Sequence, residues 1–352
     1  MPNDHQSNHQ STVELLIGSQ IYTGWKEVKV IPSISSIAGS FDLAMTDIKA
    51  KRVREVHEGD ECQIKLNGEL VIDGYIDDVL PFFDAKDHGV RVTGRDKTAD
   101  LIDCSAVFDP GEWNKQTLLE IAKDVCAVYS VEVVADVDVG PAFKKFRLEP
   151  GESCFDLLDR AARMRGVLLI PNNGQLLITR AGTDVAPTAL VEGVNIKGGN
   201  ALRSYRDRYK TYIVKGQSDD EGFTEPGLSV GPSETVTDDD VTRERTLVIL
   251  AEDAADATAC EAQAIWERNV RRARSRRAEI VVQGWNHDKG LWRRNTLVPV
   301  KSEMLSINQE LLIETISYTL NKDGTLATMN VVPAEAYEVL PLKEKKDDDP
   351  WL

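Results

Sequence analysis

The chain has 352 residues, 41% hydrophobic and 28% charged, which is enough apolar material for two to three folded domains. Its formal net charge of −16 at pH 7 argues against strong nonspecific binding to nucleic acid or to acidic membranes. Apolar runs such as 247–251 are too short to span a bilayer, and the polar segment 1–12 lacks the features of a secretory signal. We therefore expect no membrane anchoring, synthesis and retention in the cytoplasm, and a disordered tail over 1–12.

The segment 13–95 predicts a first antiparallel β domain. Its short apolar runs are rich in β-branched and aromatic residues and are interrupted by Gly24, Pro32 and the hairpin dipeptide Asn67-Gly68. About six strands joined by tight turns are typical of a small barrel or sandwich.

The pattern changes at Asp96 and predicts a small α/β domain over 96–182. Apolar residues recur at helical spacing in 114–130 and 152–166, with Gly166 at the C-cap position of the second helix. A hairpin around Asn173-Gly174 is expected to follow.

A second β domain is predicted over 183–342, followed by a polar tail over 343–352. Within it, the stretch 218–240 holds eight Asp or Glu residues among Gly, Pro, Ser and Thr, so we expect a solvated loop; a contact with a partner protein is the alternative. The stretch 251–275 predicts the longest helix, with acids near its start and arginines near its end. Four strands complete the domain.

These four strands can be aligned with four strands of the first β domain, in the same order. "SFDLAMT" aligns with "AEIVVQG", "ECQIKLNGELVIDGYI" with "LVPVKSEMLSINQELLIETISY", and "GVRVTG" with "LATMNV". Identity is slight beyond the pairs Glu69-Leu70 and Glu310-Leu311. Either the chain contains two copies of one β domain, or its hairpins are alike by chance.

The stretch 94–105, GRDKTADLIDCS, holds the strongest candidates for chemistry. On a helix starting near Lys97, Asp96, Asp100 and Asp103 would share a face, as the paired carboxylates of a hydrolase require. Acids near a helix start are also favoured by capping and by the helix dipole. We favour a joint between two domains, formed by Gly94, Asp96, Asp100 and Asp103, with Gly94 either at positive φ or in close backbone contact. The alternative hypothesis is a cell-wall hydrolase that uses the three aspartates.

One basic patch, 266–277, lies in this acidic chain. Arginine pairs well with carboxylates, so we expect contacts with Asp or Glu of the same or a neighbouring subunit; a solvated face and a DNA contact are the alternatives. Tryptophans near glycines at strand ends are expected to anchor a core or an interface. The candidate interface residues are Arg268, Arg271, Arg272, Arg274, Trp285, Trp292 and Arg293.

Metal, cofactor and nucleophile motifs are not evident in the sequence. The five cysteines are scattered without a CxxC pair, the histidines are isolated, and the phosphate loops and the GxSxG elbow are missing. We therefore expect no cofactor, no metal and no catalytic residue.

Three stretches resemble a known family. They are "GYIDDVLPFFDAKDHGVRVTGRDKTADLIDCSAV", "GESCFDLLDRAARMRGVLLIPNNGQLLITR" and "GWNHDKGLWRRNTLVPV". Over residues 13–340 the chain resembles the baseplate hub protein of Mu-like contractile-tailed phages, which is similar in turn to the T4 hub and to the base of type VI secretion spikes.

The resemblance implies a mixed, mainly β fold with two similar antiparallel β-barrel-like tube domains and a small α/β insert domain. It also implies a homotrimer, in which three chains form a pseudo-six-fold ring that joins the tail tube, or other baseplate proteins, to the central spike. DNA would only pass through the bore. The resemblance therefore favours a true repeat and a structural protein of the virion tail baseplate, assembled in the host cytoplasm.

Overall fold

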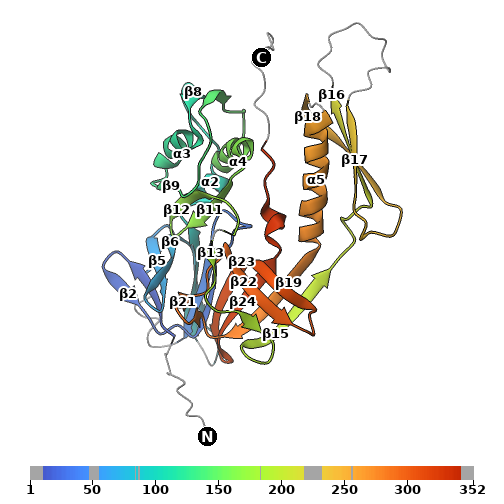
Figure 1. The fold of residues 1–352 in the computed structure, drawn as a ribbon. Helices are drawn as coiled ribbons and strands as arrows, with labels where there is room; N and C mark the ends of the chain where they lie inside the picture. The colour runs from blue at the N-terminus through green and yellow to red at the C-terminus, as the bar shows by residue number, and fades with distance from the viewer. Residues whose placement is uncertain are drawn as a thin grey trace.

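The computed structural model describes residues 11–46, 55–83, 85, 88–182, 184–217, 232–254 and 257–341 (Figure 1). The predicted tail 343–352 and most of the tail 1–12 lie outside these residues. Strands dominate the fold, as predicted. The helices are α2 (Ala99–Asp103), α3 (Leu118–Ala127), α4 (Cys154–Arg165), α5 (Ala257–Arg274) and the 3-10 helix η1 (Ala334–Tyr337).

The first part of the chain, which we call the first β unit, consists of antiparallel strands. They are β1 (Val13–Ile17), β2 (Gln20–Tyr22), β3 (Glu27–Ile31), β4 (Ser40–Thr46), β5 (Glu61–Leu66), β6 (Glu69–Phe83) and β7 (His88–Asp96). The β5–β6 hairpin turns at Asn67 and Gly68, which both have positive φ, as this dipeptide predicts.

The insert, from α2 to β12, packs α3 and α4 together beside two small sheets. Its strands are β8 (Glu112–Gln116), β9 (Val133–Ala135), β10 (Phe143–Arg147), β11 (Leu168–Asn172) and β12 (Gln175–Thr179), paired as β8–β10 and β11-β12-β9. Capping boxes at Thr117 and Ser153 start α3 and α4, and Gly166 ends α4 in the left-handed conformation. Helix α3 starts later than predicted because residues up to Gln116 form β8.

The second β unit contains the remaining strands of the main sheet. They are β13 (Asp184–Val185), β14 (Leu190–Val191), β15 (Ile196–Arg203), β19 (Arg276–Gln283), β22 (Thr296–Ser302), β23 (Ile307–Asn321) and β24 (Gly324–Val332). A short hairpin, β20 (Asn286–His287) and β21 (Gly290–Leu291), lies between β19 and β22.

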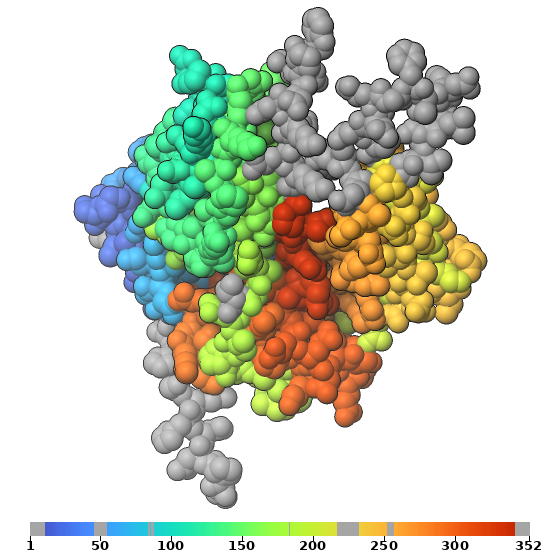
Figure 2. Space-filling view, turned by 45° about the horizontal axis from the view of Figure 1, so that its top comes forward, coloured from blue at the N-terminus to red at the C-terminus, as the bar shows by residue number. Residues whose placement is uncertain are grey.

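A side module interrupts the second β unit between β15 and β19. Strands β16 (Thr211–Gln217), β17 (Ser233–Thr237) and β18 (Thr246–Ala254) form a sheet whose apolar residues pack against α5. Figure 2 shows this module in yellow to orange and the insert in green, on either side of the red C-terminal segment.

Two sequence predictions in this module were partly wrong. Residues 233–237 of the predicted acidic loop 218–240 form β17, and residues 251–254 of the predicted helix 251–275 belong to β18. These residues form strands because they pair with β16, and this pairing outweighs the preference of their local composition for a loop or a helix. Residues 218–231 of the predicted loop lie outside the described residues.

The two β units are halves of one continuous sheet of 14 strands, in the order β15-β19-β24-β23-β3-β4-β7-β6-β5-β1-β2, with β13, β14 and β22 branching from β23. They join where the end of β23 pairs with β3. One hydrophobic core runs through both units. The two tube domains that we predicted therefore share a sheet and a core within one chain.

The predicted repeat is visible in the strand order. β3-β4-β7-β6-β5 in the first unit corresponds to β15-β19-β24-β23-β22 in the second, and every neighbouring pair is antiparallel. Even a β-bulge recurs, with one extra residue in β6 at Asp77 and one in β23 at Glu314. Such agreement in register argues for two copies of one unit.

The register corrects our alignment of the two copies. Ile76 pairs with Gly94, and Ile313 pairs with Val331, directly before each bulge. These pairs therefore correspond, and Glu310 then matches Asp73 rather than Glu69. The shared Glu-Leu dipeptide is a coincidence, although the strands were matched in the right order.

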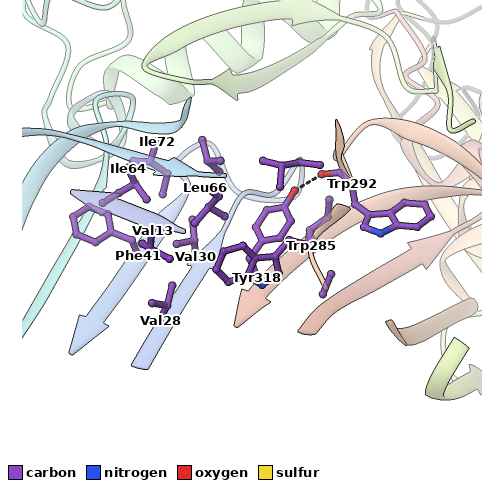
Figure 3. Close-up of a cluster of buried hydrophobic side chains, with 14 of the residues drawn as sticks. Val13, Val28, Val30, Phe41, Ile64, Leu66, Ile72, Trp285, Trp292 and Tyr318 are labelled. Atoms are coloured by element: carbon purple, nitrogen blue, oxygen red, sulfur yellow. Dashed lines mark hydrogen bonds between the residues drawn. The ribbon is translucent and has the colours of Figure 1, made fainter. Parts of the chain in front are cut away.

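The core at the junction of the units is held by aromatic side chains (Figure 3). Trp285 is 1% exposed, its Nε1 donates to the Thr319 carbonyl at 3.1 Å, and its ring stands edge-on to Tyr318. The Tyr318 hydroxyl donates to the Trp292 carbonyl. Large buried rings with paired polar atoms therefore fix the two halves of the sheet to each other.

Candidate functional site: the domain joint and the arginine surface

Gly94 lies in β7, between β4 and β6 in the sheet, at the start of the motif GRDKTADLIDCS. Its φ is not positive, but a Cβ there would lie 2.2 Å from the Tyr75 carbonyl oxygen and 2.5 Å from the Phe41 ring. Of the two conformations that we predicted, the structure has the close approach. Glycine is required because backbone and an aromatic ring occupy the space of any side chain.

Asp96 ends β7 and ties the first β unit to the insert. Its carboxylate is 2% exposed and accepts hydrogen bonds from the Thr98 backbone at 3.3 Å, the Thr98 hydroxyl at 3.1 Å and the Gly174 backbone at 3.1 Å. Gly174 is in the β11–β12 turn. Burial raises the pKa of Asp96 to about 6, although these hydrogen bonds oppose the shift.

The pKa of Asp96 predicts a pH dependence of stability. Between its ordinary value of 3.8 and about 6, the folded chain keeps a proton that the unfolded chain releases. Stability that is present below pH 3.8 is therefore lost as pH rises to about 6, by roughly 1–3 kcal/mol. Denaturant unfolding at several pH values should show this loss for the wild type and not for Asp96→Asn. Parallel profiles for the two proteins would contradict it.

Asp103→Asn is the matched control, because the shift at Asp103 has the opposite sign. The Arg95 guanidinium, 2.7 Å away, lowers the pKa of Asp103. The stability that Asp103 contributes is present above its ordinary pKa and is lost as pH falls. The wild type should therefore lose stability relative to Asp103→Asn as pH falls, whereas relative to Asp96→Asn it loses stability as pH rises.

The hydrolase hypothesis requires the three aspartates to share a helix face, and in the structure they do not. Helix α2 begins at Ala99, so Asp96 belongs to a strand and its carboxylate is directed to Thr98 and Gly174. Asp103 pairs with Arg95, and burial together with the nearby Asp103 raises the pKa of Asp100. The predicted helix start was early because the tight turn after β7 takes up Lys97 and Thr98.

The joint brings together all three parts of the chain. Lys97 contacts Asp73 of β6 at 3.2 Å, and Arg294 of the second β unit donates to the Pro171 carbonyl of the insert. The insert is thus fastened to both β units by polar contacts around the end of β7.

The arginines of the predicted patch make contacts within the chain. Arg271 pairs with Glu267 at 2.7 Å, and Arg272 pairs with Asp240 at 2.8 Å. Arg268 donates to the Asn269 side chain, and Arg274 donates to the Ala336 carbonyl at 3.2 Å. Arg293 reaches across the units to Glu69 at 2.7 Å. Of the alternatives, pairing within the subunit is the one that these contacts favour.

Family models match three successive parts of the chain. They describe the N-terminal domain of the Mu phage baseplate assembly protein GpP-like (residues 12–96), the second domain of the baseplate hub protein gp44-like (98–180) and the fourth domain of the Mu phage baseplate assembly protein GpP (256–340). The baseplate hub protein gp44 of Escherichia phage Mu is 34% identical over 348 residues, which cover 96% of this chain and 92% of that protein.

The chain belongs to the Mu baseplate hub protein family. Its role is therefore that of a structural hub protein of the phage tail baseplate, a part of the virion.

Solved structures agree with this assignment. The 43 kDa tail protein of prophage MuSo2 from Shewanella oneidensis has a TM-score of 0.84 and 34% identity, covering 94% of this chain and 100% of that one. A tail protein from Neisseria meningitidis MC58 has a TM-score of 0.79 at 21% identity, covering 93% and 99%. The c3393 protein of E. coli, a type VI secretion component described as structurally similar to the T4 tail proteins gp27 and gp5, shares the fold at a TM-score of 0.57 and 12% identity, covering 93% and 79%.

Two predicted interface residues of this hub family member are core residues. Trp285 and Trp292 are 1% and 2% exposed within the single chain, so they cannot reach a second copy. They lie between the two β units, where large rings fill the shared core. The prediction that they anchor a core was correct, and an intersubunit role for them was wrong.

No pattern in the sequence indicates the ion pair that fastens the side module of this hub protein. Arg208 and Asp238 are each 2% exposed. Arg208 donates two hydrogen bonds, of 3.0 and 2.6 Å, to one carboxylate oxygen of Asp238. Asp240 accepts from Arg208 as well and pairs with Arg276 at the start of β19. The carboxylates belong to the stretch that we predicted as a solvated loop, thirty residues from Arg208, so local sequence could not reveal the pairing.

Within the described residues, no helix is long and apolar enough to cross a membrane. In the same part of the chain, no group of three or more His, Cys, Asp or Glu side chains is placed to hold a metal ion.

Proposed function

We propose that this hub protein forms a homotrimeric ring in the tail baseplate. The observation that carries the proposal is the internal repeat, because two β units with the same strand order and the same bulge lie side by side in one sheet. Three such chains would supply six similar units, which gives three-fold symmetry by chain and pseudo-six-fold symmetry by β unit.

The ring would join the tail tube to the central spike. The insert follows the first β unit and the side module interrupts the second, each once per chain, so these parts would follow three-fold symmetry. The β units could meanwhile match a six-fold neighbour. DNA would pass through the bore without being bound, which a net charge of −16 supports.

We further propose that the chain acts without catalysis and without a cofactor, and that it assembles in the host cytoplasm before it enters the virion. Asp96 is buried in the joint, and Asp103 is held by Arg95. A structural use of these carboxylates therefore accounts for their positions. The Asp100→Asn and Asp103→Asn variants should assemble normally, and neither the wild type nor the variants should lyse cell walls.

Light scattering and low-resolution imaging test the ring directly. The expected result is a particle with the mass of three chains and a central hole. A single-chain mass that persists at high protein concentration would overturn the proposal. Binding of DNA that falls steeply with added salt would instead favour the arginine patch as a DNA contact.

A further inference from the structure

Two long stretches of strand edge in the main sheet have no partner among the described residues. Beyond a single bridge between Ile196 and Glu192, β15 pairs along one side only, with β19, and the second half of β6, from Asp77 onward, pairs only with β7. Four large apolar side chains on these edges are exposed, namely Leu80 (49%), Phe82 (42%), Phe83 (87%) and Leu202 (50%). An unpaired, apolar edge favours addition of another strand.

The chain already contains the junction that such an edge would make. Where β23 meets β3, Tyr318 pairs with Val30, Thr319 with Lys29 and Leu320 with Val28. The ladder continues at the Ile316 N–H, which donates to the Pro32 carbonyl at 3.1 Å, and at Ser33, whose hydroxyl lies 2.7 Å from that of Thr315. This junction buries Val30 and Tyr318 to 2% exposure or less.

The repeat gives each residue of this junction an equivalent on the unpaired edges. The pairing of β15 with β19 corresponds to that of β3 with β4, and the pairing of the end of β6 with β7 corresponds to that of the end of β23 with β24. Val28, Lys29 and Val30 correspond in this way to Gly199, Asn200 and Ala201. Tyr318, Thr319 and Leu320 correspond to Pro81, Phe82 and Phe83.

We propose that β15 of one copy of the chain pairs, antiparallel, with the end of β6 of a second copy, in the register Pro81 to Ala201, Phe82 to Asn200 and Phe83 to Gly199. The same register sets Leu80 opposite Leu202. The occupant of each edge is thus a second copy of this chain. This inference rests on the proposed ring and names the surfaces that close it.

The side chains on the two edges fit this register. Phe83, the most exposed apolar residue of the pair of edges, faces Gly199, which has no side chain, and Leu80 faces another leucine. Pro81 lacks an N–H where its equivalent Tyr318 has one, so the junction between copies would have one hydrogen bond fewer than the internal one. Proline on an open edge also disfavours pairing with unrelated strands.

The pairing is head-to-tail, because the two edges are different. A dimer would leave one edge of each kind uncovered, whereas a closed ring covers all of them. Strand pairing between copies would then repeat the pairing within each copy.

Paired cysteines test the register. Phe82 and Asn200 correspond to Thr319 and Lys29, which lie between the hydrogen-bonded pairs of the ladder, where side chains come closest. Oxidised Phe82→Cys/Asn200→Cys protein should run as covalent multimers on a non-reducing gel. Phe82→Cys/Leu202→Cys is the matched control, since its residues would be diagonal neighbours about 7–8 Å apart, beyond the reach of a disulfide. Four of the five native cysteines are buried, and Cys104 is half-buried, so the single variants measure any background.

Light scattering of the same preparations separates this inference from the proposed ring. Trimer mass with cross-linking of the first variant and not of the control is the expected result. Trimer mass without cross-linking, or with equal cross-linking of both, overturns the edge pairing and leaves the trimer standing. A monomer overturns both. As a second measurement, Leu202→Asp should lower the trimer fraction. The same substitution at an exposed leucine of the side module, Leu250→Asp (65% exposed), should not.

Discussion

Replacement of Asp238 by alanine is expected to lower the free energy of unfolding by about 3–5 kcal/mol. Arg208 would remain buried at 2% exposure without the carboxylate that accepts two of its hydrogen bonds, and its longer contact of 3.2 Å with the exposed Asp240 would be the ion pair left to it. A buried charge that has lost its buried partner is far more costly than the loss of an exposed ion pair, which contributes about 0–1 kcal/mol. Because Arg208 and Asp238 lie at the base of the side module, the loss should concentrate there.

Denaturant unfolding, together with amide hydrogen exchange of β16 to β18, measures this effect. Asp239→Ala is the control, since the neighbouring carboxylate is exposed and its loss should change stability little. A variant that replaces both partners, Arg208→Met with Asp238→Leu, should recover much of the loss. Equal stability of the Asp238→Ala and Asp239→Ala proteins would show that the buried pair does not hold the module.

Gly94→Ala should destabilise the chain by about 3 kcal/mol or more. The added methyl group would lie 2.2 Å from the Tyr75 carbonyl oxygen, and backbone in the middle of a sheet cannot move away without breaking the pairing of β6 with β7. The change also pushes on Phe41, which is buried in the core.

Gly198→Ala provides the comparison for this substitution. It is also a glycine of the main sheet without positive φ, but no atom lies within 4 Å of a Cβ built there. Thermal or denaturant unfolding should show a small effect for Gly198→Ala and a large one for Gly94→Ala. Similar effects for both would mean that the close approach at Gly94 is relieved at little cost.

The sequence predicted the order of the repeated strands but not their alignment. β-strands have a side-chain period of two, so moving β6 against β23 by four residues keeps buried positions on buried positions. The pattern alone therefore could not exclude the shift that the Glu-Leu coincidence suggested. Hydrogen-bond register, which joins Ile76 to Gly94 and Ile313 to Val331, was needed to decide it.

The candidate site was predicted as a joint between domains, and the structure places Gly94 and Asp96 in β7, with Asp96 bonded to Gly174 of the insert. The helix start was missed because nothing in the local sequence shows that Asp96 bonds to Gly174, far along the chain. The same limit applies to Asp238. Its neighbours in the sequence, rich in acidic residues, Gly, Pro, Ser and Thr, predict a loop, while its partner Arg208 comes from another segment. Long-range polar pairing is not encoded in local periodicity or composition.

The bulges of β6 and β23 have a consequence for how new domains could be added to this fold. The extra residue is an acid in both units, and each acid holds the segment that leaves the last strand of its unit. Asp77 binds Arg95, which in turn binds Asp103 of α2, whereas Glu314 accepts the hydroxyl of Tyr337 in η1. One exit carries a whole domain and the other a short C-terminal segment. The duplicated unit thus uses one bulge position in both copies to hold the segment that follows it, whether that segment begins a whole domain or is a single short helix.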